Sequence, residues 1–199
     1  MIQSCKEYVY KVIYMFASNI FNCRVIDVGC GTGEYTSIFS RNGNCVIVLD
    51  VQSRVEEKYS KFLFIRGDGT RMLFDSGSVD IVVSFDVIEH VEDALTFLKE
   101  THRVLKKDGR VFMSTPNRER LSHLLLKIIG RGVKYPLTLG EDCIHIREYT
   151  KGELEDLFQK ASFKNIYMPE LGGIAIESHR YRANKISKGI KSGCAVLVC

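Results

Sequence analysis

The sequence has little of several residue types and lacks two common motifs. Its 199 residues include no tryptophan and only three prolines. Its seven cysteines are scattered and contain no Cys-x-x-Cys pair, which excludes a zinc ribbon and a thiol redox motif and favours a reducing, cytoplasmic setting. The chain also lacks a long apolar run. Lys11 and Asn19 interrupt residues 9–21, so we expect neither a signal peptide nor a membrane-spanning helix.

The excess of one sign of charge over the other is also small. The chain carries 28 Lys and Arg against 24 Asp and Glu, a net charge of +4, which is too small to indicate nucleic-acid binding by itself. With 45% hydrophobic residues, the chain can bury the core of one domain over residues 1–199. Apolar residues recur at helical spacing between positions 9 and 20, which predicts a covering helix over residues 6–21.

Short β-branched runs alternate with helical patterns along the chain. We expect helices at residues 94–105 and after Thr150, whose capping box includes Glu153. The expected strands are residues 24–28, 45–49, 62–66, 79–84, 110–114, 164–168 and 195–198. This order predicts an α/β fold, a doubly wound seven-stranded and mostly parallel sheet with helices on both faces. Residues 116–143 are an insertion or lid after the fifth strand.

The strongest motif is the strand and glycine-rich turn at residues 25–33, Val-Ile-Asp-Val-Gly-Cys-Gly-Thr-Gly. Such a turn brings the backbone close to a ligand at the carboxyl edge of a sheet. It is not the Gly-x-Gly-x-x-Gly of dinucleotide sites, because Glu34 and Thr36 occupy the two candidate positions for the third glycine. Asp27 and Glu34 would repel phosphates but suit a ligand with an ammonium and a sulfonium, such as S-adenosylmethionine (SAM).

Two further carboxylates follow the next two strands. Asp50 ends the second strand, where it can accept hydrogen bonds from both ribose hydroxyls; a solvated loop acid is the alternative. Asp68 follows the third strand and can accept a hydrogen bond from an adenine amino group, although taken alone it would be an ordinary turn residue.

Together these motifs resemble those of class I SAM-dependent methyltransferases, with matching segments at residues 27–33, 50, 67–74, 84–91 and 104–117. The resemblance implies that the glycine loop holds the methionine part of SAM. It also implies that the acid after strand two holds ribose, that the acid after strand three lies by adenine, and that residues after strand four line the methionine end. The corresponding cofactor residues are Asp27, Gly29, Cys30, Gly31, Asp50, Asp68, Gly69, Ser84 and Phe85.

The segment after the fourth strand carries candidate acceptor-site residues. Asp86, Glu89 and His90 would share one face of a helical turn, and His145 is the best candidate for a fourth metal ligand. Oxygen and imidazole ligands suit a divalent ion such as Mg²⁺, Mn²⁺ or Zn²⁺. Local packing of the Glu-His pair is the alternative. Without a metal, His90 and His145 remain candidate catalytic general bases.

Two subfamilies share parts of this pattern. Residues 114–154 resemble the quinone-pathway, catechol-type O-methyltransferases. The acid-x-x-Glu-His segment with a later histidine resembles, more weakly, 3′-terminal RNA 2′-O-methyltransferases. Both act on paired hydroxyls, which a metal could hold and activate. Asp86 is shorter than the Glu often found at its position, and this departure bears on the metal geometry.

Two basic segments offer further contacts. In residues 118–136, apolar residues at helical spacing lie beside basic ones, which fits a helix packed on the core, a substrate lid or an interfacial membrane helix. The second segment fits a solvated helix face, or a surface that docks on anionic lipid or RNA phosphate. Its basic residues are Arg180, Arg182, Lys185, Lys188 and Lys191.

We therefore expect a SAM-dependent methyltransferase that acts on an oxygen of a small or lipid-like acceptor. An RNA-terminal 2′-O-methyltransferase and a non-catalytic SAM-binding regulatory subunit are the alternatives. Peripheral membrane contact fits the insertion, and the sequence predicts no particular oligomeric state.

Overall fold

A parallel sheet forms the centre of the computed structural model, which describes residues 5–52, 62–119, 123, 128–138, 144–168 and 195–198. Its six strands lie in the order β3-β2-β1-β4-β5-β8, and every neighbouring pair is parallel. They are β1 (Arg24–Val28), β2 (Cys45–Asp50), β3 (Leu63–Arg66), β4 (Val79–Phe85), β5 (Leu105–Thr115) and β8 (Ala195–Val198). The chain reverses its direction of travel across the sheet between β1 and β4, the switch point where open α/β sheets bind ligands.

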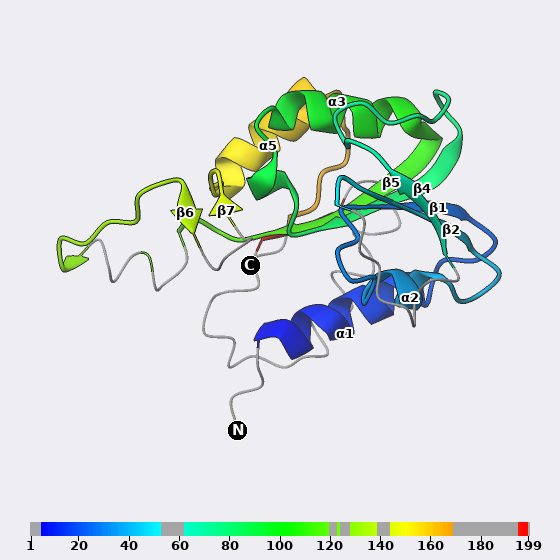
Figure 1. The fold of residues 1–199 in the computed structure, drawn as a ribbon, viewed down its shortest axis with the longest axis horizontal. Helices are drawn as coiled ribbons and strands as arrows, with labels where there is room; N and C mark the ends of the chain where they lie inside the picture. The colour runs from blue at the N-terminus through cyan, green and yellow to red at the C-terminus, as the bar shows by residue number, and fades with distance from the viewer. Residues whose placement is uncertain are drawn as a thin grey trace.

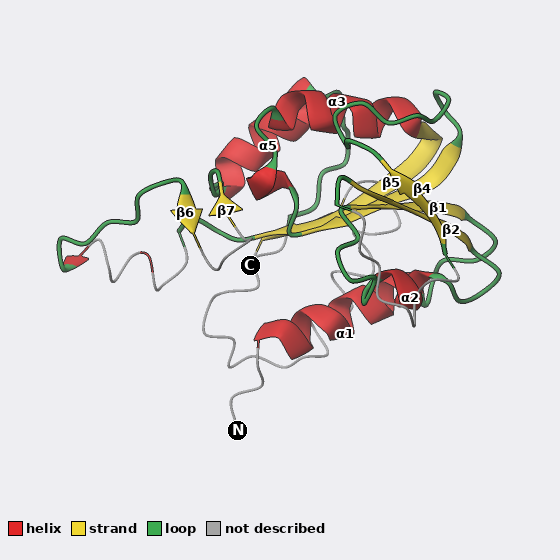
Figure 2. Ribbon diagram, in the orientation of Figure 1, coloured by secondary structure: helices red, strands yellow, loops and turns green. Residues whose placement is uncertain are grey.

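Helices lie on the two sides of this sheet (Figures 1 and 2). α1 (Cys5–Ala17) and α2 (Thr36–Phe39) lie on one side, and α3 (Ala94–Val104) and α5 (Lys151–Lys160) on the other. On the α1 side, Phe16 stacks on Phe112 of β5 with ring centroids 3.9 Å apart. On the α3 side, Phe97 and Phe158 are buried in a second apolar cluster. Because both faces are covered, β1 and β4 are nearly continuous apolar runs.

The predicted strand count of seven is wrong, because residues 164–168 form no strand. Asn165 has a φ of 55°, and Ser162 just before the segment has a φ of 70°. This left-handed conformation interrupts the extended backbone that a strand needs. The described residues therefore place six strands in the main sheet.

The insertion and the covering helix also differ in detail from the expectation. α1 ends at Ala17, earlier than residue 21. β6 (Leu137–Thr138) of the insertion pairs antiparallel with β7 (Ile144–His145), which lies just after the insertion; the sequence did not predict this small sheet. Ile128 and Ile129 are 72% and 64% exposed, so they do not pack on the core.

Several predicted features lie outside the described residues. They include positions 121, 124 and 125 of the apolar pattern in the insertion, and the basic residues of the segment 180–191. Among the helices that the structure does describe, none combines the length and apolar character needed to cross a membrane.

Candidate active site

A cavity of about 410 Å³ opens at the carboxyl ends of β1 and β2, beside the loops that follow β3 and β4. Four of the nine predicted cofactor residues line it: Gly29, Asp50, Asp68 and Gly69. Apolar walls come from Leu49, Val87 and Phe97, and His90 also lines the cavity. An apolar cavity with a few placed carboxylates is the usual form of a small-molecule site.

Asp50 is held in place by backbone amides. Its Oδ2 accepts a hydrogen bond from the Gly31 amide at 3.0 Å, and its Oδ1 accepts one from the Gln52 amide at 2.8 Å. A carboxylate oxygen has more than one acceptor position, so both oxygens can still receive hydroxyl donors. The side chain is therefore oriented before a ligand arrives.

Two glycines allow loops from different strands to meet at the cavity. A Cβ on Gly29, whose φ is 72°, would lie 2.3 Å from Val87 Cγ2. A Cβ on Gly69 would lie 2.7 Å from the ring of Phe97. Both distances are shorter than real Cβ contacts, so a side chain at either position would displace Val87 or Phe97 and reshape the cavity wall.

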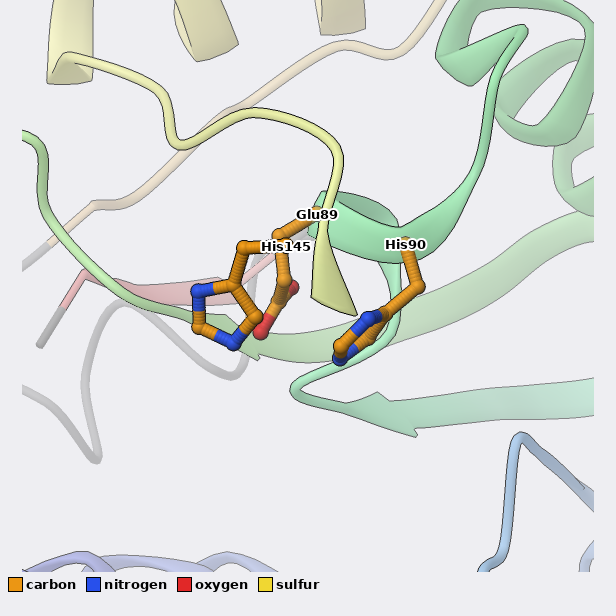
Figure 3. Close-up of side chains that lie close together, drawn as sticks. All are labelled: Glu89, His90 and His145. Carbon is orange, nitrogen blue, oxygen red and sulfur yellow. The ribbon is translucent and has the colours of Figure 1, made fainter. Parts of the chain in front are cut away.

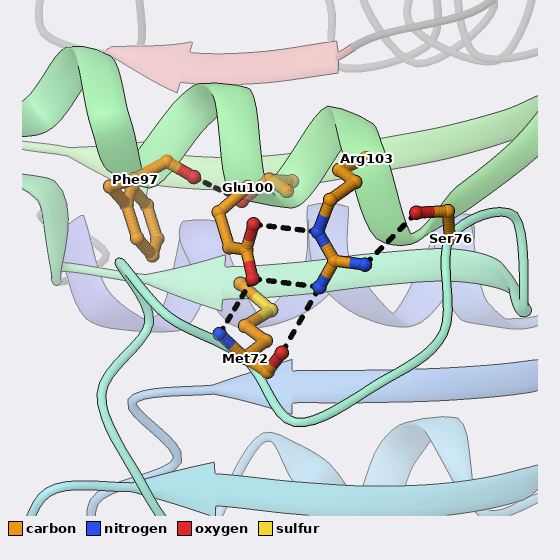
Figure 4. Close-up of polar contacts among 6 residues, drawn as sticks. Met72, Ser76, Phe97, Glu100 and Arg103 are labelled. Carbon is orange, nitrogen blue, oxygen red and sulfur yellow. Dashed lines mark hydrogen bonds and ion pairs between the residues drawn. The ribbon is translucent and has the colours of Figure 1, made fainter.

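The loop after β3 is fixed to α3 by a cluster of polar contacts (Figure 4). Glu100 accepts hydrogen bonds from the Met72 amide and from Arg103, both at 2.8 Å. Arg103 in turn donates to the Met72 carbonyl at 3.0 Å and to Ser76 Oγ at 3.1 Å. These contacts fix the loop to α3 a few residues after Asp68, which itself lines the cavity.

The other five predicted cofactor residues do not line the cavity: Asp27, Cys30, Gly31, Ser84 and Phe85. Asp27 is buried and accepts a hydrogen bond from Thr36 Oγ1, and burial raises the pKa of its carboxyl to about 7. Ser84 is buried, and Phe85 packs against Tyr35, with ring centroids 5.1 Å apart. Burial also raises the pKa of the Cys30 thiol to about 12, so this side chain is not a thiolate nucleophile.

Gly31 lies outside the cavity wall but touches it through Asp50, to which its amide donates. Its φ of 51° belongs to the left-handed region that glycine adopts without strain. Its role in the structure is thus to present the amide that orients the Asp50 carboxylate.

Three of the four predicted metal-site residues come together (Figure 3). Glu89, His90 and His145 each offer one ligand atom, and these atoms lie within 4.8 Å of one another. The rings of His90 and His145 meet edge to face with centroids 4.9 Å apart. The two histidines lie 55 positions apart in the sequence, and the Ile144 carbonyl lies 2.7 Å from His90 Nδ1.

Asp86 does not join these three residues, because the expected helical turn over residues 86–90 does not form. Only Ile88–His90 are helical, as one turn of 3₁₀-helix labelled η2. Asp86 has a φ of 54°, is exposed and accepts a hydrogen bond from Ser114 Oγ at 2.8 Å. Because Asp86 is in the left-handed conformation, residues 86, 89 and 90 do not have the helical i, i+3, i+4 arrangement on which the four-ligand prediction rested.

Glu89 is fully buried and only half satisfied. Its Oε2 accepts a hydrogen bond from Thr115 Oγ1 at 3.0 Å, whereas Oε1 has no hydrogen-bond partner among the residues that the structure describes. Burial, reinforced by the nearby Asp86 and Glu148 carboxylates, raises the pKa of Glu89 to about 8. Leaving a buried oxygen without a partner is costly. We therefore expect Glu89 Oε1 to carry a proton or to face a cation or a hydrogen-bond donor.

Sequence reasoning missed a second buried carboxylate behind His145. Glu148 has no exposed surface, and its Oε1 lies 3.0 Å from His145 Nδ1. Its Oε2 accepts a hydrogen bond from Tyr135 at 2.9 Å and lies 3.4 Å from His123 Nδ1. The spacing His-x-x-Glu was visible in the sequence, but nothing there linked it to Tyr135 or His123 of the insertion.

A second cavity, of about 640 Å³, lies between the insertion and the start of α5. Arg118, His123, Val133, Tyr135 and Thr150 are among its lining residues. Two residues of its wall, His123 and Tyr135, contact Glu148. Glu148 in turn contacts His145, whose ring lies against His90 of the first cavity. Successive side-chain contacts therefore connect the two cavities.

Comparison with known proteins assigns the family. Residues 6–168 match the family model described as a methyltransferase domain. A relative from Mycolicibacterium smegmatis, named as a probable S-adenosylmethionine-dependent methyltransferase, is 32% identical over 160 residues, which cover 78% of this chain and 58% of the relative. A ubiquinone biosynthesis O-methyltransferase from Pelagibacter ubique is 28% identical over 138 residues, covering 65% of this chain and 57% of the relative.

Among solved structures, the fold resembles that of 1,6-didemethyltoxoflavin-N1-methyltransferase from Burkholderia thailandensis, which was crystallised with 1,6-didemethyltoxoflavin and S-adenosylhomocysteine (SAH). The TM-score is 0.58 at 19% identity, covering 82% of this chain and 69% of that one. The chain belongs to the methyltransferase domain family, and the predicted membership of the class I SAM-dependent methyltransferases is confirmed. SAM is the cofactor of this family. The matched region spans less than two thirds of the two relatives.

Proposed function

We propose that this protein transfers the methyl group of SAM to an oxygen atom of a small or lipid-like acceptor. The observation that carries the proposal is the cavity at the switch point, where Asp50 and Asp68 line the same space as Gly29, Gly69 and His90. Asp50 would bind the ribose hydroxyls, and Asp68 the adenine amino group. Gly29 and the turn that follows it would hold the methionine part.

The chemistry needs a group that takes a proton from the acceptor. In the reaction, the acceptor oxygen attacks the methyl carbon of the sulfonium, the carbon–sulfur bond breaks, and SAH leaves with the bonding electrons. The hydroxyl proton passes to an imidazole, for which His90 on the cavity wall and His145 beside it are the candidates. Holding the two reacting atoms in line supplies much of the rate acceleration.

A metal-assisted form of the same reaction is a second candidate, favoured by the Glu89, His90 and His145 cluster. The donor set fits a divalent ion. Glu89 Oε1 lacks a protein partner among the described residues, and Nδ1 of each histidine contacts another group, which leaves Nε2 for an ion. A bound ion would lower the pKa of an acceptor hydroxyl. Asp86 lies outside this set.

The acceptor is proposed from chemistry and likeness together. One relative carries the name ubiquinone biosynthesis O-methyltransferase, which directs the first choice to catechols. The second cavity beside Tyr135 and His123 offers room for the body of such a molecule. The exposed Ile128 and Ile129 of the insertion suit an acceptor that carries an apolar chain.

The test is methyl transfer from SAM labelled in its methyl group. Purified protein is incubated with catechols, quinols, sugars and short RNAs, and products are identified by mass. We expect label on a catechol oxygen, with loss of turnover in Asp50→Ala. Turnover lost in EDTA and restored by Mg²⁺ or Mn²⁺ would select the metal-assisted form, and full turnover in EDTA the general-base form. Label only on RNA, or on nitrogen, would overturn the proposed acceptor.

A further inference from the structure

The buried carboxylate of Glu148 has no place in the chemistry described so far. Its side chain is completely buried, and side chains from three positions converge on its two oxygens. Oε1 faces His145 Nδ1, whereas Oε2 faces the Tyr135 hydroxyl and His123 Nδ1. Burying a carboxylate is costly unless polar groups surround it, and here different side chains face its two oxygens.

The geometry at His145 separates the two nitrogens of its ring. Nδ1 lies 3.0 Å from Glu148 Oε1, and the imidazole is only 5% exposed, so packing holds the ring in place. In Figure 3 the other ring nitrogen is turned toward the carboxylate of Glu89, on the side where His90 also lies. The ring therefore joins the buried Glu148 on one side to the candidate acceptor site on the other.

We propose that Glu148 is a positioning residue that keeps the proton of neutral His145 on Nδ1. A carboxylate only accepts hydrogen bonds, so Nδ1, which lies 3.0 Å from Glu148 Oε1, donates to it. Glu89 Oε1, on the other side of the ring, has no hydrogen-bond partner among the described residues, so Nε2 makes no such donation to it. Nε2 then carries a lone pair directed at the Glu89 and His90 group, where it can take the proton of an acceptor hydroxyl or bind a cation. Carboxylates set the tautomer of catalytic and metal-binding histidines in this way in unrelated proteins. The inference rests on the proposed methyl transfer at this site.

Tyr135 gives this arrangement a link to the insertion. Its hydroxyl donates to Oε2 of Glu148, which leaves Oε1 directed at His145. Tyr135 also lines the second cavity, where we place the body of the acceptor. The insertion therefore contacts Glu148, the residue whose other carboxylate oxygen faces His145.

The direct test is the tautomer of His145 in the full chain. Protein labelled with ¹⁵N-histidine is studied at pH 8 by long-range proton–nitrogen correlation, which distinguishes a ring protonated on Nδ1 from one protonated on Nε2. The His145 signals are identified by their loss in His145→Gln. We expect the Nδ1–H form in the wild type. In Glu148→Gln the amide can donate to Nδ1, so the Nε2–H form should appear.

Two further variants serve as controls, and a thermal melting curve checks that each variant is folded. Glu148→Asp retains the carboxylate and should keep part of the Nδ1–H population. Tyr135→Phe removes a donor from the same carboxylate but not the contact with His145, so its tautomer should match the wild type. A wild type in the Nε2–H form, or an unchanged tautomer in a folded Glu148→Gln, would overturn the inference.

Methyl transfer to a catechol supplies the second readout. We expect Glu148→Gln to lower kcat by roughly tenfold or more while KM for SAM stays within about twofold, because general-base assistance is lost and the cofactor contacts are elsewhere. An equal fall of affinity for SAM would contradict a role confined to His145. If the wild type leaves catechol unmethylated, the proposed acceptor is wrong, and the tautomer measurement still decides the role of Glu148.

Discussion

Replacing Glu89 with Gln should change how the stability of the protein depends on pH. In the folded chain the pKa of Glu89 is raised to about 8, above its ordinary value of 4.5, because the side chain is fully buried and lies near Asp86 and Glu148. Between these two pH values the folded protein holds a proton that the unfolded chain has released. The free energy of unfolding therefore falls as pH rises through this window and is level on either side of it.

The size of the effect follows from the shift. One pKa unit corresponds to about 1.4 kcal/mol, so Glu89 alone lowers the free energy of unfolding by at most about 5 kcal/mol between pH 4 and pH 9. Glu89→Gln removes this dependence. Its amide can keep an oxygen toward Thr115, although the new NH₂ needs an acceptor and costs roughly 1–3 kcal/mol at every pH if it finds none.

Urea denaturation at pH 5, 7 and 9 in the presence of EDTA measures this difference. We expect wild type and Glu89→Gln to diverge with rising pH, by a few kcal/mol in favour of the variant, beyond any constant offset. Glu155→Gln removes an exposed carboxylate from α5 and serves as the matched control, with the slope of the wild type. Parallel pH profiles for wild type and Glu89→Gln would refute the account of Glu89 as a buried, protonated acid.

Two further substitutions test the packing of the fold, one at the cofactor cavity and one at the start of α5. Gly69→Ala places a methyl group 2.7 Å from Phe97, so we expect a lower melting temperature and weaker SAH binding; unchanged values for both would show that the loop tolerates a side chain. Thr150→Ala removes the oxygen that accepts a hydrogen bond from the Glu153 amide at the start of α5. We expect the free energy of unfolding in urea to fall by about 1 kcal/mol with SAM affinity unchanged. An unchanged free energy of unfolding would show that the capping box does not stabilise α5.

Local patterns in the sequence predicted much of the fold. The family and the Rossmann-like parallel sheet are confirmed, because buried parallel strands are short apolar runs and the glycine turn has a distinctive spacing. The predicted strand at residues 164–168 failed where Asn165 adopts a left-handed conformation. Asparagine tolerates this conformation, but an apolar run gives no sign that it is used.

The site was less accessible to sequence reasoning. The four-ligand set assumed a helical turn from Asp86, and the left-handed φ at that residue depends on its contacts with Ser114 of the neighbouring strand. The partners of Glu148 come from the insertion, and such long-range pairing has no periodic signal. Asp27 and Phe85 occupy the expected positions in the chain, yet their side chains are buried in the core rather than in the cavity wall.

The most direct test of the central claim is calorimetric titration of the purified protein with SAM, SAH and NAD. The cavity at the switch point predicts binding of SAM and SAH, and it predicts that Asp50→Ala weakens both by roughly 1–3 kcal/mol, the cost of leaving hydroxyl partners unpaired. Asp156→Ala, which removes an exposed carboxylate on α5, should bind SAM as the wild type does. Binding of NAD without binding of SAM, or an Asp50→Ala variant with undiminished affinity, would contradict the account.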